Sequence, residues 1–286
     1  MQNEESLRLE RLEPGIATLT QCRRGGPNVI SVDFCERLLQ CTEILANEDG
    51  LAAVVLRAEG STFCVGVDIH SLHQHLDDLP AQVASLIDSA HAAVLAMRRL
   101  PVPVIASVAG TAAGGGFSLA LACDRVMAGR SARFVVAYPQ LGTTPDMGMS
   151  HALVALLGPR RALDLVLARS PFGADDAHRL GLVSEVCDDE ALDDAALAAA
   201  REWAALPPAA VRGSKALFAA DDIEAMERQM EREKASFVRC AATAEFRRRV
   251  IAFSNGGHDE EKAQGVGRRR RRGQRHDDDT APATAC

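Results

Sequence analysis

Residues 112–117 have the sequence Ala-Ala-Gly-Gly-Gly-Phe, and this glycine turn joins a predicted strand at 102–108 to a predicted helix at 115–123. Consecutive glycines let the backbone approach a ligand closely. A helix that starts at such a turn directs its unpaired N–H groups and the positive end of its dipole at that ligand, which stabilises negative charge. The turn matches neither a P-loop nor a G-x-G-x-x-G motif. Taken alone, it is explained equally well by close helix–sheet packing.

A second glycine turn, Phe-Cys-Val-Gly-Val-Asp at 63–68, follows another apolar run. Around the two turns, strand-like runs alternate with helical patterns: we predict strands at 15–21, 52–57 and 125–128, and helices at 31–46 and 81–100. A continuous apolar run is typical of a strand that is buried on both faces of a sheet. The alternation predicts an α/β architecture.

The second half of the chain is predicted to be helical. Helical spacing or composition occurs at 148–157, 160–167, 174–180, 189–205, 207–219 and 221–253. After the glycines at 256–257 the sequence changes to charged and small residues. We therefore predict an α/β core over 1–200, a helical region over 201–257 and a disordered charged tail over 258–286.

Charge, cysteine content and hydropathy argue against nucleic-acid-binding, metal-binding and membrane proteins. The formal net charge of the 286-residue chain is −7, which argues against nucleic acid as a partner. The arginine run at 268–272 is explained better by a solvated tail than by nucleic-acid binding. The eight cysteines form no Cys-x-x-Cys pair, so no metal site is expected, and free thiols suit a reducing cytosol. We predict a cytoplasmic protein that binds no membrane, since segment 1–12 lacks a signal-peptide core and no apolar stretch looks long enough to cross a bilayer.

The order of four motifs is more specific than either turn alone. They are Phe-x-x-Gly-x-Asp at 63–68, Ala-x-Gly-Gly-Gly at 112–116, Leu-Gly-x-x-Pro at 141–145 and Gly-Leu-Val at 181–183. In this combination the chain closely resembles the enoyl-CoA hydratase/isomerase (crotonase) superfamily. The Ala-Cys-Asp sequence at 122–124 also fits that pattern.

The resemblance implies a crotonase-like spiral of ββα units with a helical C-terminal region that serves trimer formation and covers the CoA pocket. It implies a homotrimer or a dimer of trimers that acts on an acyl-CoA thioester, with coenzyme A as part of the substrate and no other cofactor. In the family, two backbone N–H groups hold the thioester oxygen as it becomes an enolate. By position we assign these donors to Val65 and Gly115, and removing one such donor typically costs about 3 kcal/mol.

The same resemblance assigns residues to substrate binding. They are Cys64, Gly66, Asp68, Gly114, Ser118, Tyr138 and Phe253. Asp68 is explained better as the N-cap of a following helix. Tyr138, the only tyrosine, either donates a hydrogen bond to the substrate or fills the pocket.

Residue types at the catalytic positions favour one reaction. Hydratases of the family hold a water molecule with two glutamates, whose positions are occupied here by Ser118 and Tyr138. Neither is a good general base near neutral pH, so efficient hydration is not expected. Asp146 remains as a single base for moving a double bond in an enoyl-CoA, with capping of the next helix as the alternative role. His151 is a weaker candidate for orienting the substrate or tuning Asp146.

Other roles stay open on the sequence alone. Decarboxylation, residual hydration, or dehalogenation with Asp146 as nucleophile would use the same oxyanion hole. A catalytically weak acyl-CoA-binding protein would keep the pocket without its acids. Of these, an enoyl-CoA isomerase accounts best for a retained Asp146 beside two lost glutamates.

Overall fold

The chain builds two sheets, and the computed structural model describes residues 6–23, 25–168 and 171–255 of it. The larger sheet has the strand order β1-β2-β3-β5-β7-β10. Its strands are β1 (Leu7–Glu13), β2 (Ile16–Gln21), β3 (Ala53–Ala58), β5 (Val104–Val108), β7 (Arg125–Gly129) and β10 (Glu185–Cys187). All neighbours are parallel except β1 and β2. The predicted tail at 258–286, including its arginine run, lies outside the described residues.

Each strand pair that links the larger sheet to a smaller one belongs to a repeated strand–strand–helix unit. The strands of the smaller sheet, in the order β4-β6-β8-β9, are β4 (Thr62–Cys64), β6 (Thr111–Ala113), β8 (Arg133–Val135) and β9 (Phe172–Gly173). The chain passes from the larger sheet to the smaller one three times, from β3 to β4, β5 to β6 and β7 to β8, and a helix follows each pair. The predicted α/β spiral of ββα units is therefore confirmed.

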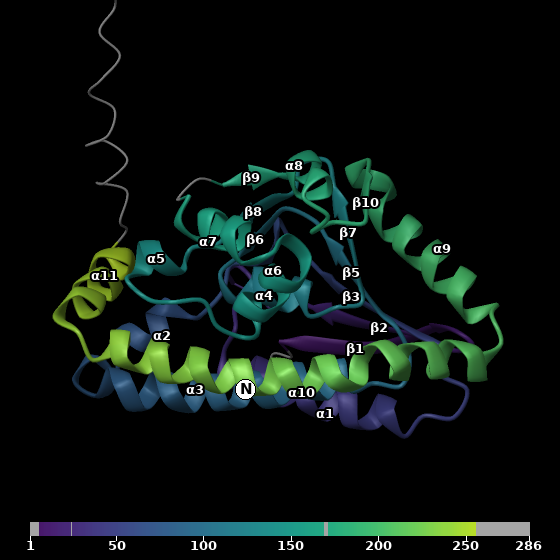
Figure 1. Cartoon of the computed structure of the whole chain (residues 1–286), viewed down its shortest axis with the longest axis horizontal. Coiled ribbons are helices and arrows are strands. Elements are labelled where there is room, and N and C mark those ends of the chain that lie inside the picture. The colour runs from purple at the N-terminus through teal and green to yellow at the C-terminus, as the bar shows by residue number, and fades with distance from the viewer. Residues whose placement is uncertain (1–5, 24, 169–170, 256–286) are drawn as a thin grey trace, which may run out of the picture.

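Helices cover both faces of the larger sheet (Figure 1). The helices are α1 (Val32–Ala46), α2 (Ile69–His73), α3 (Leu79–Arg98), α4 (Gly115–Leu121), α5 (Tyr138–Leu141), α6 (Met149–Leu157), α7 (Pro159–Leu167), α8 (Ala174–Arg179), α9 (Leu192–Ala204), α10 (Pro208–Ala241) and α11 (Ala244–Ser254), with 3₁₀ turns η1 (Leu76–Asp78) and η2 (Asp189–Ala191). Alternate strand residues face opposite sides, so Val54 and Leu56 join the main core while Val55 packs under α9.

The C-terminal helices differ from the prediction. Segments 207–219 and 221–253 are not separated near residue 220, because α10 runs unbroken to Ala241. Within this unbroken helix, Asp222 pairs with Arg98 of α3 and His151 of α6. The chain breaks where Thr243 caps α11 by accepting a hydrogen bond from the Phe246 N–H at 3.2 Å. The predicted boundary at residue 200 falls inside α9.

One helical stretch corrects the expectation that no segment is long and apolar enough to cross a bilayer. Leu76–Arg98 meets that test of length and composition. It contains α3, whose apolar side chains, such as Val83, Ile87 and Val94, are buried in the main core. A helix buried in a core passes the same test as a membrane span, so the stretch is weak evidence for a membrane segment.

Close contact between α4 and β4 generates the first testable prediction. A Cβ atom at Gly116 would lie 2.0 Å from the Cys64 carbonyl oxygen, which is backbone and has no room to move. We expect Gly116→Ala to lower the melting temperature far below that of wild type, or to leave no folded protein to melt. Gly213→Ala is the matched control, because nothing lies within 4 Å of a Cβ atom there and alanine is favoured over glycine inside a helix by about 1 kcal/mol. Thermal unfolding followed by circular dichroism makes the comparison, and equal melting temperatures for the two variants would contradict the packing argument.

Candidate active site

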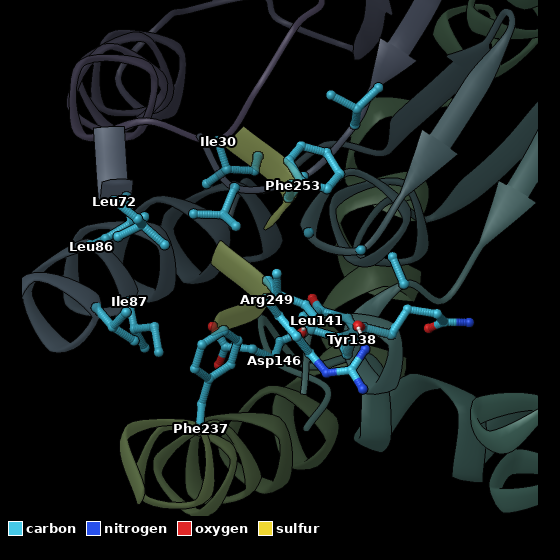
Figure 2. Close-up of a pocket in the computed structure, with 18 of the residues that line it drawn as sticks. Ile30, Leu72, Leu86, Ile87, Tyr138, Leu141, Asp146, Phe237, Arg249 and Phe253 are labelled. Carbon is cyan, nitrogen blue, oxygen red and sulfur yellow. Dashed lines mark hydrogen bonds between the residues drawn. The ribbon is translucent and has the colours of Figure 1, made fainter. Parts of the chain in front are cut away.

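A cavity of about 510 Å³ opens beside the two glycine turns. Helices α2, α3, α10 and α11 supply most of its apolar wall, and Figure 2 shows Leu86, Ile87 and Phe237 on it. Of the described residues that line it, Asp146 is the only acidic one and Arg249 the only cation. Such a cavity suits a mainly apolar ligand that is held by a few polar groups.

Parallel pairing of β4 and β6 brings the two glycine turns together. A Cβ atom on Gly66 would lie 2.9 Å from the Ala113 carbonyl oxygen and 3.2 Å from the Gly115 nitrogen. Gly66 also has a φ of +91°, which residues with side chains rarely adopt. This position therefore requires glycine, and glycine lets the two turns form one surface of the cavity.

The first oxyanion-hole donor corrects the sequence prediction. The Val65 N–H group donates to the Asn28 carbonyl oxygen at 2.9 Å and is therefore not available to a ligand. Val67 forms a parallel β-bridge with Ile30. The Ile30 N–H donates to the Gly66 carbonyl oxygen, and the Ile30 carbonyl oxygen accepts from the Asp68 N–H. In such a bridge the central residue directs its own N–H group to the opposite side. For Val67 that is the side where β6 leads into the Gly115 turn.

The second donor agrees with the prediction in its position. Gly115 is the first residue of α4, and the first N–H groups of a helix have no partner inside it. Both Gly115 and Val67 line the cavity, and no hydrogen bond within the described part of the chain uses the Val67 N–H. Val67 and Gly115, rather than Val65 and Gly115, are thus the backbone pair that can hold an oxyanion.

The Asp146 carboxylate points into this cavity and does not cap a helix (Figure 2). Its side chain is buried, and Oδ1 lies 2.7 Å from Nε2 of His91, which is also buried. Gly148 occupies the N-cap position of α6. The alternative that Asp146 caps α6 is therefore wrong, and a histidine from α3 orients its carboxylate.

A hydroxyl pair occupies the two positions where hydratases carry glutamates. Ser118 Oγ lies 2.8 Å from Tyr138 Oη, and both hydroxyl groups contact the Asp146 carbonyl oxygen, at 2.8 and 3.2 Å. Tyr138 lines the cavity, but Ser118 lies behind its wall and is wrong as a substrate-binding residue. The pair holds the backbone of Asp146 and offers no general base.

Glu233 of α10 caps the helix that follows Asp146. Its buried carboxylate accepts the Gly148 N–H at 2.7 Å and the Ser150 N–H at 2.8 Å. It also accepts the Ser150 hydroxyl. Burial raises the pKa of Glu233, while these hydrogen bonds oppose the rise. Glu233 thus fixes the peptide segment just after Asp146.

Neither His91 nor Glu233 was identified from the sequence. Each lies on the buried stripe of its helix: His91 with Ile87 and Val94, and Glu233 with Met230 and Phe237. A polar residue on such a stripe signals a buried partner, but it does not identify that partner.

His91, Asp146 and Glu233 each offer an atom that could bind a metal ion, and these atoms lie within 4.8 Å of one another. The His91 nitrogen and one Asp146 oxygen already bond each other, and both Glu233 oxygens accept hydrogen bonds. A metal would have to displace these bonds, so we treat the group as a hydrogen-bonded cluster.

The remaining predicted residues fall into two groups. Gly66, Gly114 and Phe253 line the cavity, as predicted for a binding site. Cys64 and Asp68 do not line it. Cys64 is fully buried, and burial raises its thiol pKa to about 12. Asp68 accepts the Ser71 N–H at 3.2 Å and so caps α2, while His151 pairs with Asp222 at 2.7 Å, away from Asp146.

Fold and site together define an α/β spiral protein whose apolar pocket contains two backbone amides that can hold an oxyanion and one carboxylate. A sequence model of the family described as enoyl-CoA hydratase/isomerase matches residues 11–260. The chain belongs to this enoyl-CoA hydratase/isomerase (crotonase) family.

Individual relatives carry different activities. The chain is 31% identical to a 1,2-epoxyphenylacetyl-CoA isomerase of Escherichia coli K12, over 86% of this chain and 94% of the relative. It is 30% identical to a 4-chlorobenzoyl coenzyme A dehalogenase of an Arthrobacter species, over 68% of this chain and 70% of the relative. Among solved structures, an enoyl-CoA hydratase/isomerase of Pseudoalteromonas atlantica superposes with a TM-score of 0.76 at 31% identity, covering 87% of this chain and 97% of that one. At this identity the exact reaction is not fixed.

The environment of Tyr138 generates a second prediction. Burial raises its pKa well above the ordinary value, with the nearby Asp146 charge as a further cause. The folded chain therefore keeps the phenol protonated at pH values where an exposed tyrosine, with a pKa of about 10, ionises. Tyr138 is the only tyrosine, so tyrosinate absorbance during an alkaline titration reports it alone. We expect no signal until the protein unfolds, and stability that falls as pH rises above about 10.

The urea-unfolded chain is the control for this titration, and it should ionise with an ordinary tyrosine pKa. A folded protein that titrates in the same range as the unfolded chain would contradict the buried hydroxyl pair.

Proposed function

We propose that this protein is an enoyl-CoA isomerase, which moves a carbon–carbon double bond in an acyl-CoA thioester. The observation that carries the proposal is a single carboxylate, Asp146, in a pocket that also contains the Val67 and Gly115 amides. A 1,3-proton shift needs one base and one oxyanion site. Hydration needs a second group to activate water, and Ser118 and Tyr138 are occupied with each other.

The proposed reaction proceeds through an enolate. Asp146 removes a proton from C2 of a 3-enoyl-CoA, and the negative charge moves to the thioester oxygen between the Val67 and Gly115 N–H groups. The protonated carboxyl then returns the proton at C4, which yields the 2-enoyl-CoA and restores the carboxylate. The hydrogen bond from His91 at 2.7 Å holds Asp146 in place during both steps.

The mouth of the pocket suits the coenzyme A portion. Helix α11 lies across it, and Phe253, which is 59% exposed, offers an apolar surface there. Arg249 also lines the pocket, although its guanidinium already bonds Glu245 and the Gln140 carbonyl oxygen. Support for a thioester substrate comes from the relatives, which are named for reactions on CoA esters.

The His91–Asp146 pair also favours a second candidate. A carboxylate held at one oxygen can attack an electron-poor carbon as a nucleophile and form an ester with the substrate. Dehalogenation of an aromatic acyl-CoA would use this step, and one relative is named for such a reaction. The isomerase is preferred because it needs only groups that already face the pocket.

Asp146→Asn tests the proposal. We expect kcat for conversion of 3-octenoyl-CoA to fall about 10²- to 10⁴-fold, the usual effect of losing a general base. KM should change little, because asparagine has the same shape. The absorbance of the conjugated 2-enoyl product gives the rate.

Asp68→Asn is the matched control, since asparagine also caps a helix and Asp68 is not among the residues that line the pocket. Equal rates for wild type and Asp146→Asn would rule out Asp146 as the base. Chloride release from 4-chlorobenzoyl-CoA, without conversion of 3-octenoyl-CoA, would select the second candidate.

We also propose that the protein forms a homotrimer or a dimer of trimers. Four large apolar side chains are exposed on the consecutive helices α6 and α7. They are Val154 (46%), Leu156 (52%), Leu163 (59%) and Leu167 (59%). Grouped apolar side chains of this kind mark protein–protein contacts.

Light scattering coupled to size-exclusion chromatography tests the assembly. We expect three or six times the monomer mass for wild type and a lower mass for Leu163→Glu/Leu167→Glu, because charge would be buried at the interface. Arg160→Glu, on the same helix at a charged position, is the control for surface charge. A monomeric wild type would contradict the proposal.

A further inference from the structure

A second cavity of about 320 Å³ lies behind the pocket, between the end of α4, α6 and α10. Its lining is partly polar and includes Ser118, Arg98 and the His151–Asp222 pair. Leu156 also lines it and is half-exposed, so in the isolated chain this rear cavity reaches the molecular surface. Polar surroundings of this size hold water.

One residue is shared by the linings of the two cavities. Met147 lines both, and no other described residue does. The chain crosses the wall at this point, since Asp146 lines the pocket and Gly148 lines the rear cavity. The Met147 sulfur lies against the Gly115 turn, 3.1 Å from the place of a Cβ atom on Gly115. The side chain is therefore part of the wall between the cavities, next to the proposed oxyanion hole.

Met147 is held in an unusual conformation. Its φ is +57°, one of only two positive values among the described residues other than glycine. The carbonyl before it receives the Ser118 and Tyr138 hydroxyl contacts, and the amide after it donates to Glu233 at 2.7 Å. Such strain persists only where the surroundings fix it, and it concentrates at functional sites.

Water beside the oxyanion hole would change the chemistry. The two N–H groups that stabilise an enolate also polarise the thioester carbonyl for attack. A water molecule could give a proton to Asp146 while its oxygen bonds to C1. The C1–sulfur bond would then break, and the protonated Asp146 would give its proton to the leaving thiolate. The products are a free acid and free CoA, and no other reactant is needed.

We propose that Met147 determines reaction specificity by keeping rear-cavity water away from the thioester carbonyl. This inference rests on the proposed acyl-CoA site. With the wall closed, Asp146 moves a proton bound to carbon. With the wall open, the same carboxylate activates water, and the enzyme becomes a thioesterase.

Met147→Gly tests the inference, because glycine removes the side chain and accepts the positive φ without strain. Free thiol is measured with saturated octanoyl-CoA, which cannot be isomerised, and isomerisation is measured separately with 3-octenoyl-CoA. We expect thiol release to rise at least about tenfold over wild type, the size of effect that a barrier change of about 1.4 kcal/mol produces. Met147→Ala should raise thiol release in the same direction and guards against a folding defect of one variant.

Met147→Leu and Met149→Ala are the matched controls. Leucine keeps the wall filled, and the buried Met149 is near in sequence but lines neither cavity. Thiol release should stay at the wild-type rate in both. Unchanged release in folded Met147→Gly and Met147→Ala, or an equal rise in Met149→Ala, would overturn the inference. If Met147→Gly releases thiol but wild type does not isomerise 3-octenoyl-CoA, the role of Met147 in excluding water stands and the proposed isomerase activity is wrong.

Discussion

The site depends on the close approach of two backbone turns that carry no side chains at their contact. Gly66 lies against the Gly115 nitrogen, and Gly116 lies against the Cys64 carbonyl oxygen. A methyl group at either contact would push α4 away from β4. This close approach places Val67 and Gly115 on one surface of the pocket, so the proposed oxyanion hole is a consequence of helix–sheet packing. The same glycines therefore permit both the close helix–sheet packing and the proposed binding of a ligand.

Around that contact, the Asp146 segment is held by residues from distant parts of the chain. His91 of α3 bonds its carboxylate, Ser118 and Tyr138 hold its carbonyl oxygen, and Glu233 of α10 holds the amides that follow. Replacing two ionised glutamates by two neutral hydroxyl groups removes charge from the pocket and leaves one carboxylate there. Buried polar groups that are fully bonded in this way specify a single geometry.

The C-terminal helices are part of this site as well as a cover for it. Helix α10 supplies Glu233 and the aromatic wall of Phe237, which makes an edge contact with Tyr138 at a centroid distance of 6.3 Å. Helix α11 then turns away from the end of α10 (Figure 1), and its residues Arg249, Ala252 and Phe253 line the pocket. Because α10 packs on α3 and α6 together, a shift of this helix would move both the apolar wall and the turn after Asp146.

The sequence by itself determined the α/β class through its apolar runs. Through the family motifs that it carries, it also determined the ββα architecture, the positions of Gly115 and Asp146 and the loss of both glutamates, because these motifs are local in the chain. It did not determine that Val67, rather than Val65, has the free amide, since the direction of an N–H group depends on pairing with Ile30. Nor could it join His91 to Asp146, 55 residues apart, or show that the predicted helices at 207–219 and 221–253 are continuous to Ala241. Those outcomes were decided by tertiary packing, because hydrogen-bond partners far apart in sequence leave no local pattern.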